Sequence, residues 1–358
     1  MARKTTLKTH TFTNKLILNQ WLMSQFGIDP LLEYKNNTRP FHKLAAPIKD
    51  AREEGYDADG LHKFYHSLVE SELFYNELHP LNKEQLLIYE ENIVSYTKTI
   101  NSMRSRPIVW KYFQWLTLLF VEIYLDRYFT DKGKLLDDLN TYIQRFNERW
   151  TGFQDIAPYT LDDLNKICLQ NATGSGKTLL MHVNLLQFRN YAKKSREGSE
   201  ISRVILLSPN ERLSEQHLEE LKLSGFSFAQ RLNTKQDSSI DMIDVIEITK
   251  LGDTEGPNTI ATRSLGDQNL LLVDEGHRGM SGKEEGVWFT RRSELCAKGF
   301  TFEYSATFAQ AVAAANNRAF EDSYAKAIIF DYSYRWFYED GFGKDYQILN
   351  LPKTYQHV

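Results

Sequence analysis

Six short apolar runs in the second part of the chain constrain its fold more than any other feature. They are rich in Ile, Val, Leu and Phe and occupy residues 166–170, 203–208, 244–249, 269–275, 300–306 and 325–333. Amphipathic helical patterns lie between them. Continuous apolar runs of this length are typical of strands buried on both faces of a parallel sheet. The sequence therefore predicts an α/β fold, with a parallel sheet covered by helices on both faces.

The first part of the chain has a different pattern. Residues 59–78 and 135–150 carry apolar side chains three and four positions apart, which predicts amphipathic helices. We therefore expect an all-α N-terminal domain over residues 1–150 and an α/β domain over residues 151–350, which is a normal domain size. No internal repeat is present, and the pattern of residues 1–150 alone indicates no function.

One segment of the helical part, residues 107–129, is apolar on nearly every side. It also carries Lys111, Glu122, Asp126 and Arg127, and each charge near a bilayer centre costs roughly 2.5–3.5 kcal/mol. A helix buried between other helices is therefore favoured over a membrane span. Neither a secretory signal nor a cysteine cluster is present, and the chain has only two cysteines, so we expect a cytoplasmic protein without a membrane partner.

The segment "ATGSGKT", residues 172–178, lies between a predicted strand and a predicted helix, which is the setting of a phosphate-binding loop. Its glycines let backbone N–H groups approach phosphate oxygens, and the helix offers its positive N-terminal end to the same anion. The lysine can reach the β- and γ-phosphates of ATP, and the following hydroxyl can ligate Mg²⁺. The first position of the motif is Asn171 instead of glycine. The predicted nucleotide-binding residues are Thr173, Gly174, Ser175, Gly176, Lys177 and Thr178.

A pair of carboxylates closes a later apolar run in "NLLLVDEGHRG". An ATPase with a phosphate-binding loop needs a carboxylate on a neighbouring strand to hold the magnesium shell, and a base to orient the attacking water. Asp274 suits the first role and Glu275 suits the second. Thr178 and Asp274 are therefore the expected metal-side residues, and Lys177, Asp274 and Glu275 are the expected catalytic residues.

Two hydroxyls flank a small residue where another apolar run ends, in "EYSATF". Ser305 and Thr307 could bond to the Asp-Glu-x-His segment and so respond to the presence of the γ-phosphate. The tripeptide alone carries little information, but its place as the third such segment, at the end of a predicted strand, is informative.

These segments together resemble the superfamily 2 helicases and translocases of the DExD/H-box type. "ATGSGKT", "DEGH" and "SAT" are similar to their motifs I, II and III. The resemblance implies that His277, Ser305 and Thr307 couple the nucleotide state to domain movement. "LLSPNERLSEQH" is similar to motif Ia, which implies that Pro209 and Gln216 contact nucleic acid, although Glu211 and Arg212 stand in the reverse of the common order.

The phrases "KYFQWLTLLFVEIYLDRYF", "DEGHRG", "EYSATF" and "DYSYRWFYEDGFGKD" resemble the motor-bearing Res subunits of type III restriction systems and related phage-defence helicases. That resemblance implies double-stranded DNA as a partner and a second RecA-like lobe, in the same or another chain, that supplies an arginine finger. No Gln-x-x-Gly-Arg-x-x-Arg segment occurs. We therefore expect residues 351–358 to begin a linker and the 358 residues to hydrolyse ATP poorly alone. A DNA methyltransferase subunit is a further possible partner.

The net charge of −4 gives no overall attraction to nucleic acid, although a groove needs only a local stripe of charge. Basic residues gather at 189–196 and at Arg291 and Arg292, and we expect such runs to face solvent.

Two other classes of function stay open. One is an ATP-bound regulatory or scaffold module that recruits a protein partner and hydrolyses little ATP. The other is a small-molecule kinase, which shares the phosphate-binding loop but does not need the later segments in this order. DNA-stimulated ATP turnover would separate the motor interpretation from both.

Overall fold

The computed structural model describes residues 12–35, 39–74, 80–149, 155–195, 200–232, 240–278 and 285–343. The predicted linker, residues 351–358, lies outside this part of the chain. The helical character expected of the first part is observed. Its α-helices are α1 (Ile17–Gln25), α2 (Pro30–Lys35), α3 (Pro40–Ala45), α4 (Lys63–Val69), α5 (Lys83–Asn101), α6 (Tyr112–Thr130) and α7 (Lys132–Arg149).

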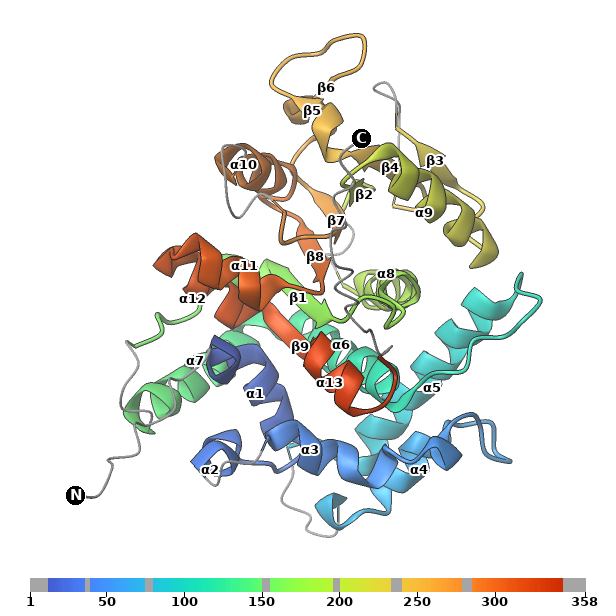
Figure 1. The fold of residues 1–358 in the computed structure, drawn as a ribbon, viewed down its shortest axis with the longest axis vertical. Coiled ribbons are helices and arrows are strands. Elements are labelled where there is room, and N and C mark those ends of the chain that lie inside the picture. Colours follow the sequence, from blue (N-terminus) through green and yellow to red (C-terminus); the bar gives the residue numbers. More distant parts are fainter. Residues whose placement is uncertain are drawn as a thin grey trace, which may run out of the picture.

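A single parallel sheet dominates the second part (Figure 1). Within the described residues it has seven strands in the order β3-β4-β2-β7-β8-β1-β9. The predicted α/β fold of the RecA-like type, preceded by a helical region, is confirmed. The strands are β1 (Lys166–Asn171), β2 (Arg203–Ser208), β3 (Ala229–Arg231), β4 (Ile243–Glu247), β7 (Asn269–Asp274), β8 (Phe300–Ser305) and β9 (Ile328–Tyr332).

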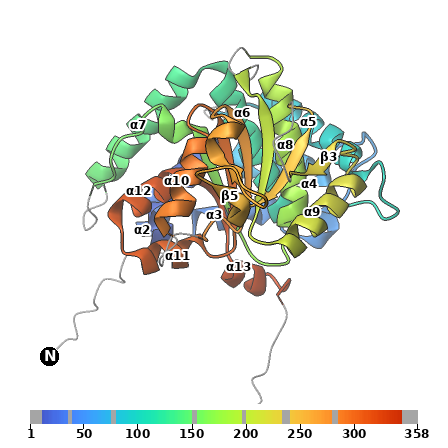
Figure 2. The same cartoon turned by 90° about the horizontal axis from the view of Figure 1, so that it is seen from above.

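Helices cover both faces of the sheet (Figures 1 and 2). On one face lie α8 (Lys177–Ala192) and α9 (Glu211–Leu223), and on the other lie α10 (Glu285–Leu295), α11 (Phe308–Ala315) and α12 (Arg318–Ala327). The remaining α-helix, α13 (Tyr334–Glu339), follows β9, and a small second sheet pairs β5 (Leu251–Gly252) with β6 (Ile260–Ala261). The short 3-10 helices are η1 (Phe12–Lys15), η2 (Ala46–Ile48), η3 (Ala51–Glu53), η4 (Glu72–Phe74), η5 (Asp162–Asn165), η7 (Ile248–Lys250) and η8 (Thr262–Leu265).

The apolar runs form strands because both of their faces are covered. Every residue of β2 and of β8 is buried. Leu206 of β2, for example, lies between Val245 of β4 and Leu272 of β7 in the parallel register. An all-parallel sheet needs this double cover, since its crossover helices must pack on its faces.

Helix α6 is the centre of the helical region, as expected of a buried helix. It packs against α5, α7 and α8, and the polar Glu122 on it is completely buried. One hydrophobic cluster continues from α1 and α6 to β1 and β9, and Asn19 Nδ2 of α1 donates to the carbonyl oxygen of Ile329 at 2.9 Å. Among the described residues, no helix is long and apolar enough to cross a membrane.

Two details differ from the sequence-based expectations. Of the described residues in the range 59–78, Lys63–Val69 form the short α-helix α4 and Glu72–Phe74 form the 3-10 helix η4. Between them, Ser71 Oγ donates to the carbonyl oxygen of Leu68 and helps to close the chain into a turn. Two basic residues that were expected to face solvent are partly or fully buried: Arg189 is half-buried and Arg292 is buried. Arg189 donates to the carbonyl oxygen of Ile240, and Arg292 is 5% exposed.

Candidate functional site

Because all strands are parallel, their carboxyl ends meet at one edge of the sheet, and the predicted site residues follow those ends. The phosphate-binding loop follows β1, Asp274 ends β7 and Ser305 ends β8. Strands β7, β8 and β1 are consecutive neighbours in the sheet. Ligands of open parallel sheets bind outside the carboxyl ends of the strands.

The phosphate-binding loop has the backbone that its glycines permit. Gly174 and Gly176 have φ angles of 82° and 88°, and Gly176 is the N-cap residue of α8. No side chain caps that helix, so its N-terminal end is open to an anion. The loop is fixed at its base, where the N–H of Ala172 donates to the carbonyl oxygen of Tyr332 at 2.9 Å.

Lys177 lies over this loop and faces the carboxylates of β7. Its Nζ donates to the carbonyl oxygen of Asn171 at 3.3 Å. Burial lowers the pKa of Lys177, although the negative charges of Glu275 and Asp274 oppose that shift. A half-buried ammonium with one long hydrogen bond is well placed to bind phosphate oxygens.

Two side chains of the loop are buried and unpaired. Asn171 is fully buried, and among the described residues neither its Oδ1 nor its Nδ2 has a hydrogen-bond partner. The hydroxyl of Ser175 is likewise buried without a partner there. Thr173 and Gly174 are exposed, and Thr178 is half-buried in the first turn of α8.

Asp274 has both carboxylate oxygens hydrogen-bonded. Its Oδ1 accepts from the N–H of Glu275 at 3.0 Å, and its Oδ2 lies 3.0 Å from His217 Nε2. Burial pushes the pKa of Asp274 up, but the hydrogen bond from His217 and the positive charge of Lys177 outweigh it, so the pKa is lowered overall. The carboxylate is therefore ionised at neutral pH.

Glu275 adopts an uncommon backbone conformation for a residue with a side chain, with φ of 53°. Its carbonyl oxygen accepts from the N–H of Arg278 at 2.9 Å, and its Oε2 lies 3.2 Å from His277 Nδ1. Left-handed backbone at a non-glycine residue concentrates at functional sites, because the surroundings must hold it.

The three predicted coupling residues lie together. Ser305 Oγ is 2.8 Å from His277 Nδ1, and it accepts from the N–H of Thr307 at 3.0 Å. The end of β8 is therefore joined to the Asp-Glu-x-His segment after β7, with Ser305 as the shared contact.

The two predicted nucleic-acid residues lie apart from this cluster. Pro209 is buried between β2 and α9, whereas Gln216 is exposed on α9. Among the described residues, Gln216 makes no hydrogen bond to the phosphate-binding loop or to Asp274.

The residues present suit magnesium bound together with a nucleotide. Asp274 is ionised, and the hydroxyl of Thr178 lies in the first turn of α8. No group of three or more His, Cys, Asp or Glu side chains in the described ranges could hold a metal alone. Mg²⁺ usually takes one or two protein oxygens together with phosphates and water, so this donor set fits such an ion.

Three residues at this site were not predicted from the sequence. His217 on α9 contacts Asp274, Gln114 on α6 donates to the carbonyl oxygen of Ser175 at 2.8 Å, and Arg292 on α10 donates to the carbonyl oxygen of Gly276 at 2.9 Å. Only His217 had a local signal, because it is the last residue of the "LLSPNERLSEQH" segment.

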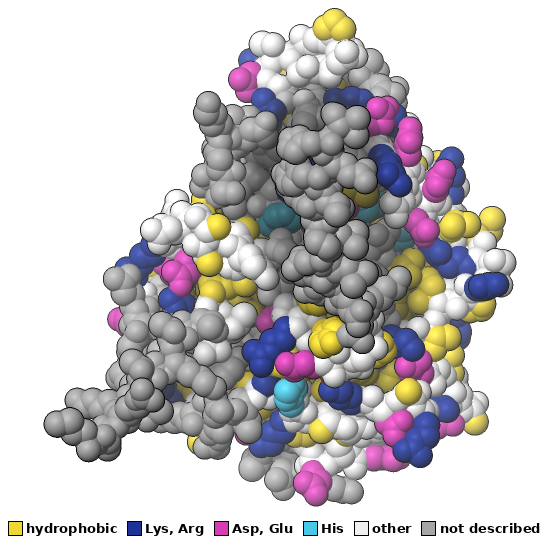
Figure 3. Space-filling view, in the orientation of Figure 1, with side chains coloured by type: hydrophobic (Ala, Val, Ile, Leu, Met, Phe, Trp, Pro, Cys, Tyr) yellow, Lys and Arg dark blue, Asp and Glu magenta, His cyan; other side chains and the backbone are white. Residues whose placement is uncertain are grey.

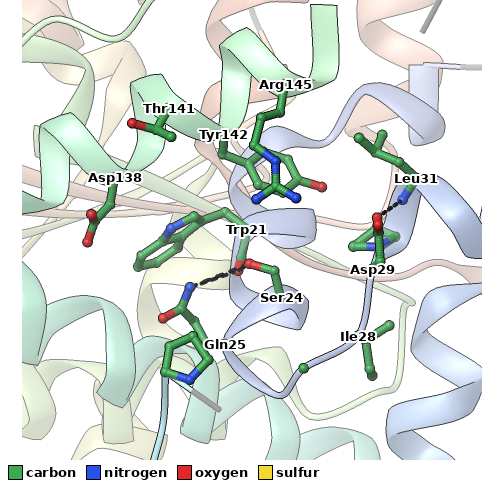
Figure 4. Close-up of a pocket in the computed structure, with 13 residues that line it drawn as sticks. Trp21, Ser24, Gln25, Ile28, Asp29, Leu31, Asp138, Thr141, Tyr142 and Arg145 are labelled. Carbon is green, nitrogen blue, oxygen red and sulfur yellow. Dashed lines mark hydrogen bonds between the residues drawn. The ribbon is translucent and has the colours of Figure 1, made fainter. Parts of the chain in front are cut away.

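A separate cavity of about 410 Å³ lies in the helical region, between α1, α2 and α7 (Figure 4). Trp21, Gln25 and Tyr142 form part of its wall, and Asp138 and Arg145 lie at the exposed side. None of the predicted site residues lines it.

The fold and this constellation define an ATPase domain with a phosphate-binding loop, of the kind found in helicase motors. Residues 135–310 match the family model described as type III restriction enzyme, res subunit. The matched range contains the phosphate-binding loop, Asp274 and Glu275, and Ser305 to Thr307, and it assigns a helicase-type motor domain to this part of the chain. No curated protein matches the chain.

Proposed function

We propose that the chain contains the first motor lobe of a DNA-dependent helicase or translocase, acting in a type III restriction-like or phage-defence system. In this proposal, residues 1–150 form a helical domain and residues 151–350 form the ATP-binding lobe. The protein acts in the cytoplasm. A second RecA-like lobe, in the same or another chain, closes over the nucleotide and supplies an arginine finger.

One observation carries the proposal most strongly. Lys177 begins α8, just after the loop that follows β1, and Asp274 and Glu275 lie where β7 ends, at the same edge of the sheet. Both carboxylates are near enough to oppose the lowering of the pKa of Lys177 by burial. Binding a scaffold partner does not require this charge arrangement, whereas phosphoryl transfer to water does.

The roles of the residues follow from their places. The backbone N–H groups of residues 173–178 bind the phosphates of ATP, apart from that of Ser175, which donates to the carbonyl oxygen of Ala172 at 3.1 Å. Lys177 binds the β- and γ-phosphates. Bound Mg²⁺ neutralises charge that develops on the phosphates. Asp274 and Thr178 hold that ion and its water shell. Glu275 accepts the proton of the attacking water.

The cluster of His277, Ser305 and Thr307 reports the state of the nucleotide. Because His277 Nδ1 lies between Glu275 Oε2 at 3.2 Å and Ser305 Oγ at 2.8 Å, a movement of Glu275 at hydrolysis changes the contacts of Ser305. We propose that this relay passes the change to the nucleic-acid path.

The nucleic acid is double-stranded DNA in this proposal, and it contacts the exposed side of α9 at Gln216, with Pro209 setting the start of that helix. On the face seen in Figure 3, basic and acidic side chains are interspersed. Ion pairs such as Lys49–Asp340 and Arg335–Glu339 use part of the basic charge of the described residues. A DNA methyltransferase subunit is a proposed further partner, in keeping with a restriction system.

The test measures ATP binding and ATP turnover by the chain, with and without double-stranded DNA. Lys177→Ala should weaken binding of a fluorescent ATP analogue by about tenfold or more, since it removes a charged phosphate ligand. Glu275→Gln should keep binding but lower turnover by about 10²-fold or more, the usual contribution of a general base. Glu91→Gln at an exposed position of α5, away from both the nucleotide site and α9, is the matched control for the change of a carboxylate to an amide.

Two results would contradict the motor interpretation. ATP binding without turnover, also after a second lobe is supplied, would favour the regulatory or scaffold module. Transfer of the phosphoryl group to a small acceptor, with no effect of DNA, would favour a kinase.

A further inference from the structure

His217 is the one side chain of α9 that contacts the magnesium-side carboxylate among the described residues. Its Nε2 lies 3.0 Å from Asp274 Oδ2, although 57 positions separate the two residues. His217 is 3% exposed, so the contact is shielded from water. An ionised carboxylate only accepts hydrogen bonds, so Nε2 carries the hydrogen and His217 donates.

The other ring nitrogen of His217 makes no hydrogen bond comparable to that of Nε2 among the described residues. Its Nδ1 is buried and has no hydrogen-bond partner within the described residues. Burying an unpaired polar atom is unfavourable, so an apolar side chain would serve the packing of α9 better. The presence of histidine is therefore explained by the hydrogen bond from Nε2 to Asp274.

That hydrogen bond fixes the direction of the carboxylate. The N–H of Glu275 holds Oδ1 of Asp274, and His217 holds Oδ2. Partners that orient the ligands of a metal affect its affinity nearly as strongly as the ligands do.

Helix α9 places His217 directly beside the exposed Gln216. Ser214, His217 and Leu221 form its buried side, and Gln216 lies on its exposed side. The helix is anchored at its far end, where Arg104 contacts both Glu220 and Ser224 at 2.9 Å. A displacement of the exposed side of this rigid helix therefore also moves the group that holds Asp274.

We propose that His217 is a positioning residue that holds the Asp274 carboxylate for magnesium and links it to nucleic acid bound on the exposed side of α9. This inference rests on the proposed function. It adds a direct connection between the nucleotide site and α9, separate from the relay through His277 and Ser305.

The chain offers a matched control in His182. It is also fully buried, its Nδ1 is bonded to Ser224 Oγ at 2.8 Å, and its Nε2 has no partner within the described residues. His182 does not contact Asp274. His182→Leu therefore removes a buried histidine and its hydrogen bond to Ser224, at the end of α9, without removing a hydrogen bond of the Asp274 carboxylate.

The experiment compares the wild-type chain with His217→Leu, His217→Gln and His182→Leu. Two binding measurements are made, neither of which needs turnover. The first is the Mg²⁺ concentration that half-saturates binding of a fluorescent ATP analogue. The second is the affinity for a labelled DNA duplex, with and without the magnesium nucleotide. Thermal unfolding of each variant shows that it is folded.

His217→Leu should raise the Mg²⁺ requirement by about tenfold, the lower end of the effect of such orienting partners. It should also abolish the difference that the nucleotide makes to DNA affinity. His217→Gln places an N–H donor near the position of Nε2 and should restore most of both properties. His182→Leu should keep the Mg²⁺ requirement of the wild type. If His217→Leu does not fold, His217→Met, which also lacks the N–H donor, takes its place.

The failures are distinguishable. A wild-type chain that does not bind the magnesium nucleotide overturns the proposed function, and this inference with it. Normal nucleotide binding with an unchanged Mg²⁺ requirement in His217→Leu overturns the positioning role alone. A raised Mg²⁺ requirement with unchanged coupling to DNA overturns the link through α9.

Discussion

Gln114 Nε2 donates a hydrogen bond to the carbonyl oxygen of Ser175, at 2.8 Å, although 61 positions separate the two residues. Its Oε1 accepts from the N–H of Lys111 at 2.9 Å, at the start of α6. One side chain therefore joins the first turn of α6 to the loop that would hold phosphate. The helical region is part of the framework of the site.

Loss of that contact should loosen the loop more than it unfolds the protein. We expect Gln114→Ala to lower the affinity for the ATP analogue about fivefold, corresponding to about 1 kcal/mol for one hydrogen bond. Gln85→Ala is the control, because Gln85 also accepts from the start of its own helix, at the N–H of Asn82, but does not contact the loop. Titration of the ATP analogue into both variants measures their affinities. If Gln85→Ala loses as much affinity as Gln114→Ala, the contact of Gln114 with the loop is not the cause.

Gly176 has little room for a side chain. Its φ is 88°, and an added Cβ would lie 2.6 Å from Gln114 Nε2. We expect Gly176→Ala to weaken nucleotide binding by about tenfold or more, because the loop or Gln114 must move, in addition to the roughly 1–2 kcal/mol that left-handed backbone costs an alanine. Gly60→Ala supplies that backbone cost alone, since Gly60 has φ of 82° and open space around it.

Nucleotide binding and thermal unfolding are measured for both glycine variants. This explanation expects the two variants to lose similar amounts of stability, and only Gly176→Ala to lose nucleotide affinity. If both variants bind nucleotide equally well, the close approach of Gln114 has no functional consequence.

The buried carboxyl of Glu122 should make stability depend on pH. Burial raises its pKa to about 7, although Gln187, Asn92 and Tyr191 donate to its oxygens and oppose the shift. The folded state therefore keeps a proton that the unfolded chain releases near its ordinary pKa of 4.5. The contribution of Glu122 to the free energy of unfolding is therefore fully present below that pH. It falls as pH rises to about 7 and is constant at higher pH.

We expect Glu122→Gln to remove this slope. Relative to the variant, the wild type should lose at most roughly 3 kcal/mol of unfolding free energy between those two pH values. Denaturant unfolding at several pH values measures the difference, and Glu91→Gln at an exposed position of α5 is the control. The two proteins are compared by how their unfolding free energy changes with pH, because the amide can also change the absolute stability. If the unfolding free energies of wild type and Glu122→Gln change with pH in parallel, Glu122 is not the source of the pH dependence.

The predictable parts of the structure are those with a local cause. Each of the six apolar runs forms a strand, because consecutive apolar residues indicate a strand that is buried on both faces. The glycines of the loop specify its backbone conformation. The three-residue strand β3 and the small β5–β6 sheet have no such pattern and were not predicted. The contacts of His217 and Gln114 span 57 and 61 positions, and no periodicity encodes them.

Arg292 shows the same limit for a charged residue. The run of basic residues around it suggested a solvent-exposed side chain, yet its Nη1 lies 3.4 Å from Glu303 Oε1 with both side chains 5% exposed. The partner lies on β8, 11 positions later, and only the packing of α10 on the sheet brings the two together.

The buried pair supports the segment that carries Glu275. Arg292 Nη1 donates to the carbonyl oxygen of Gly276, and the N–H of Gly276 donates to the carbonyl oxygen of Tyr304, each at 2.9 Å. Arg292→Met should destabilise the fold by about 3–5 kcal/mol, because it leaves the charge of Glu303 buried without its cationic partner. The hydroxyl of Tyr324 still donates to Glu303 Oε2 at 2.7 Å but carries no charge. ATP turnover should fall more than ATP binding, since Glu275 loses its support while Lys177 does not.

The double variant with Glu303→Gln separates the two effects. It removes the unpaired charge, so much of the stability should return, whereas the carbonyl of Gly276 still lacks its donor and turnover should stay low. Denaturant unfolding and ATP turnover of the two single variants and the double variant measure this. A double variant as unstable as Arg292→Met would show that the ion pair is not the reason, and recovery of turnover with stability would show that Arg292 supports the fold without positioning the segment of Glu275.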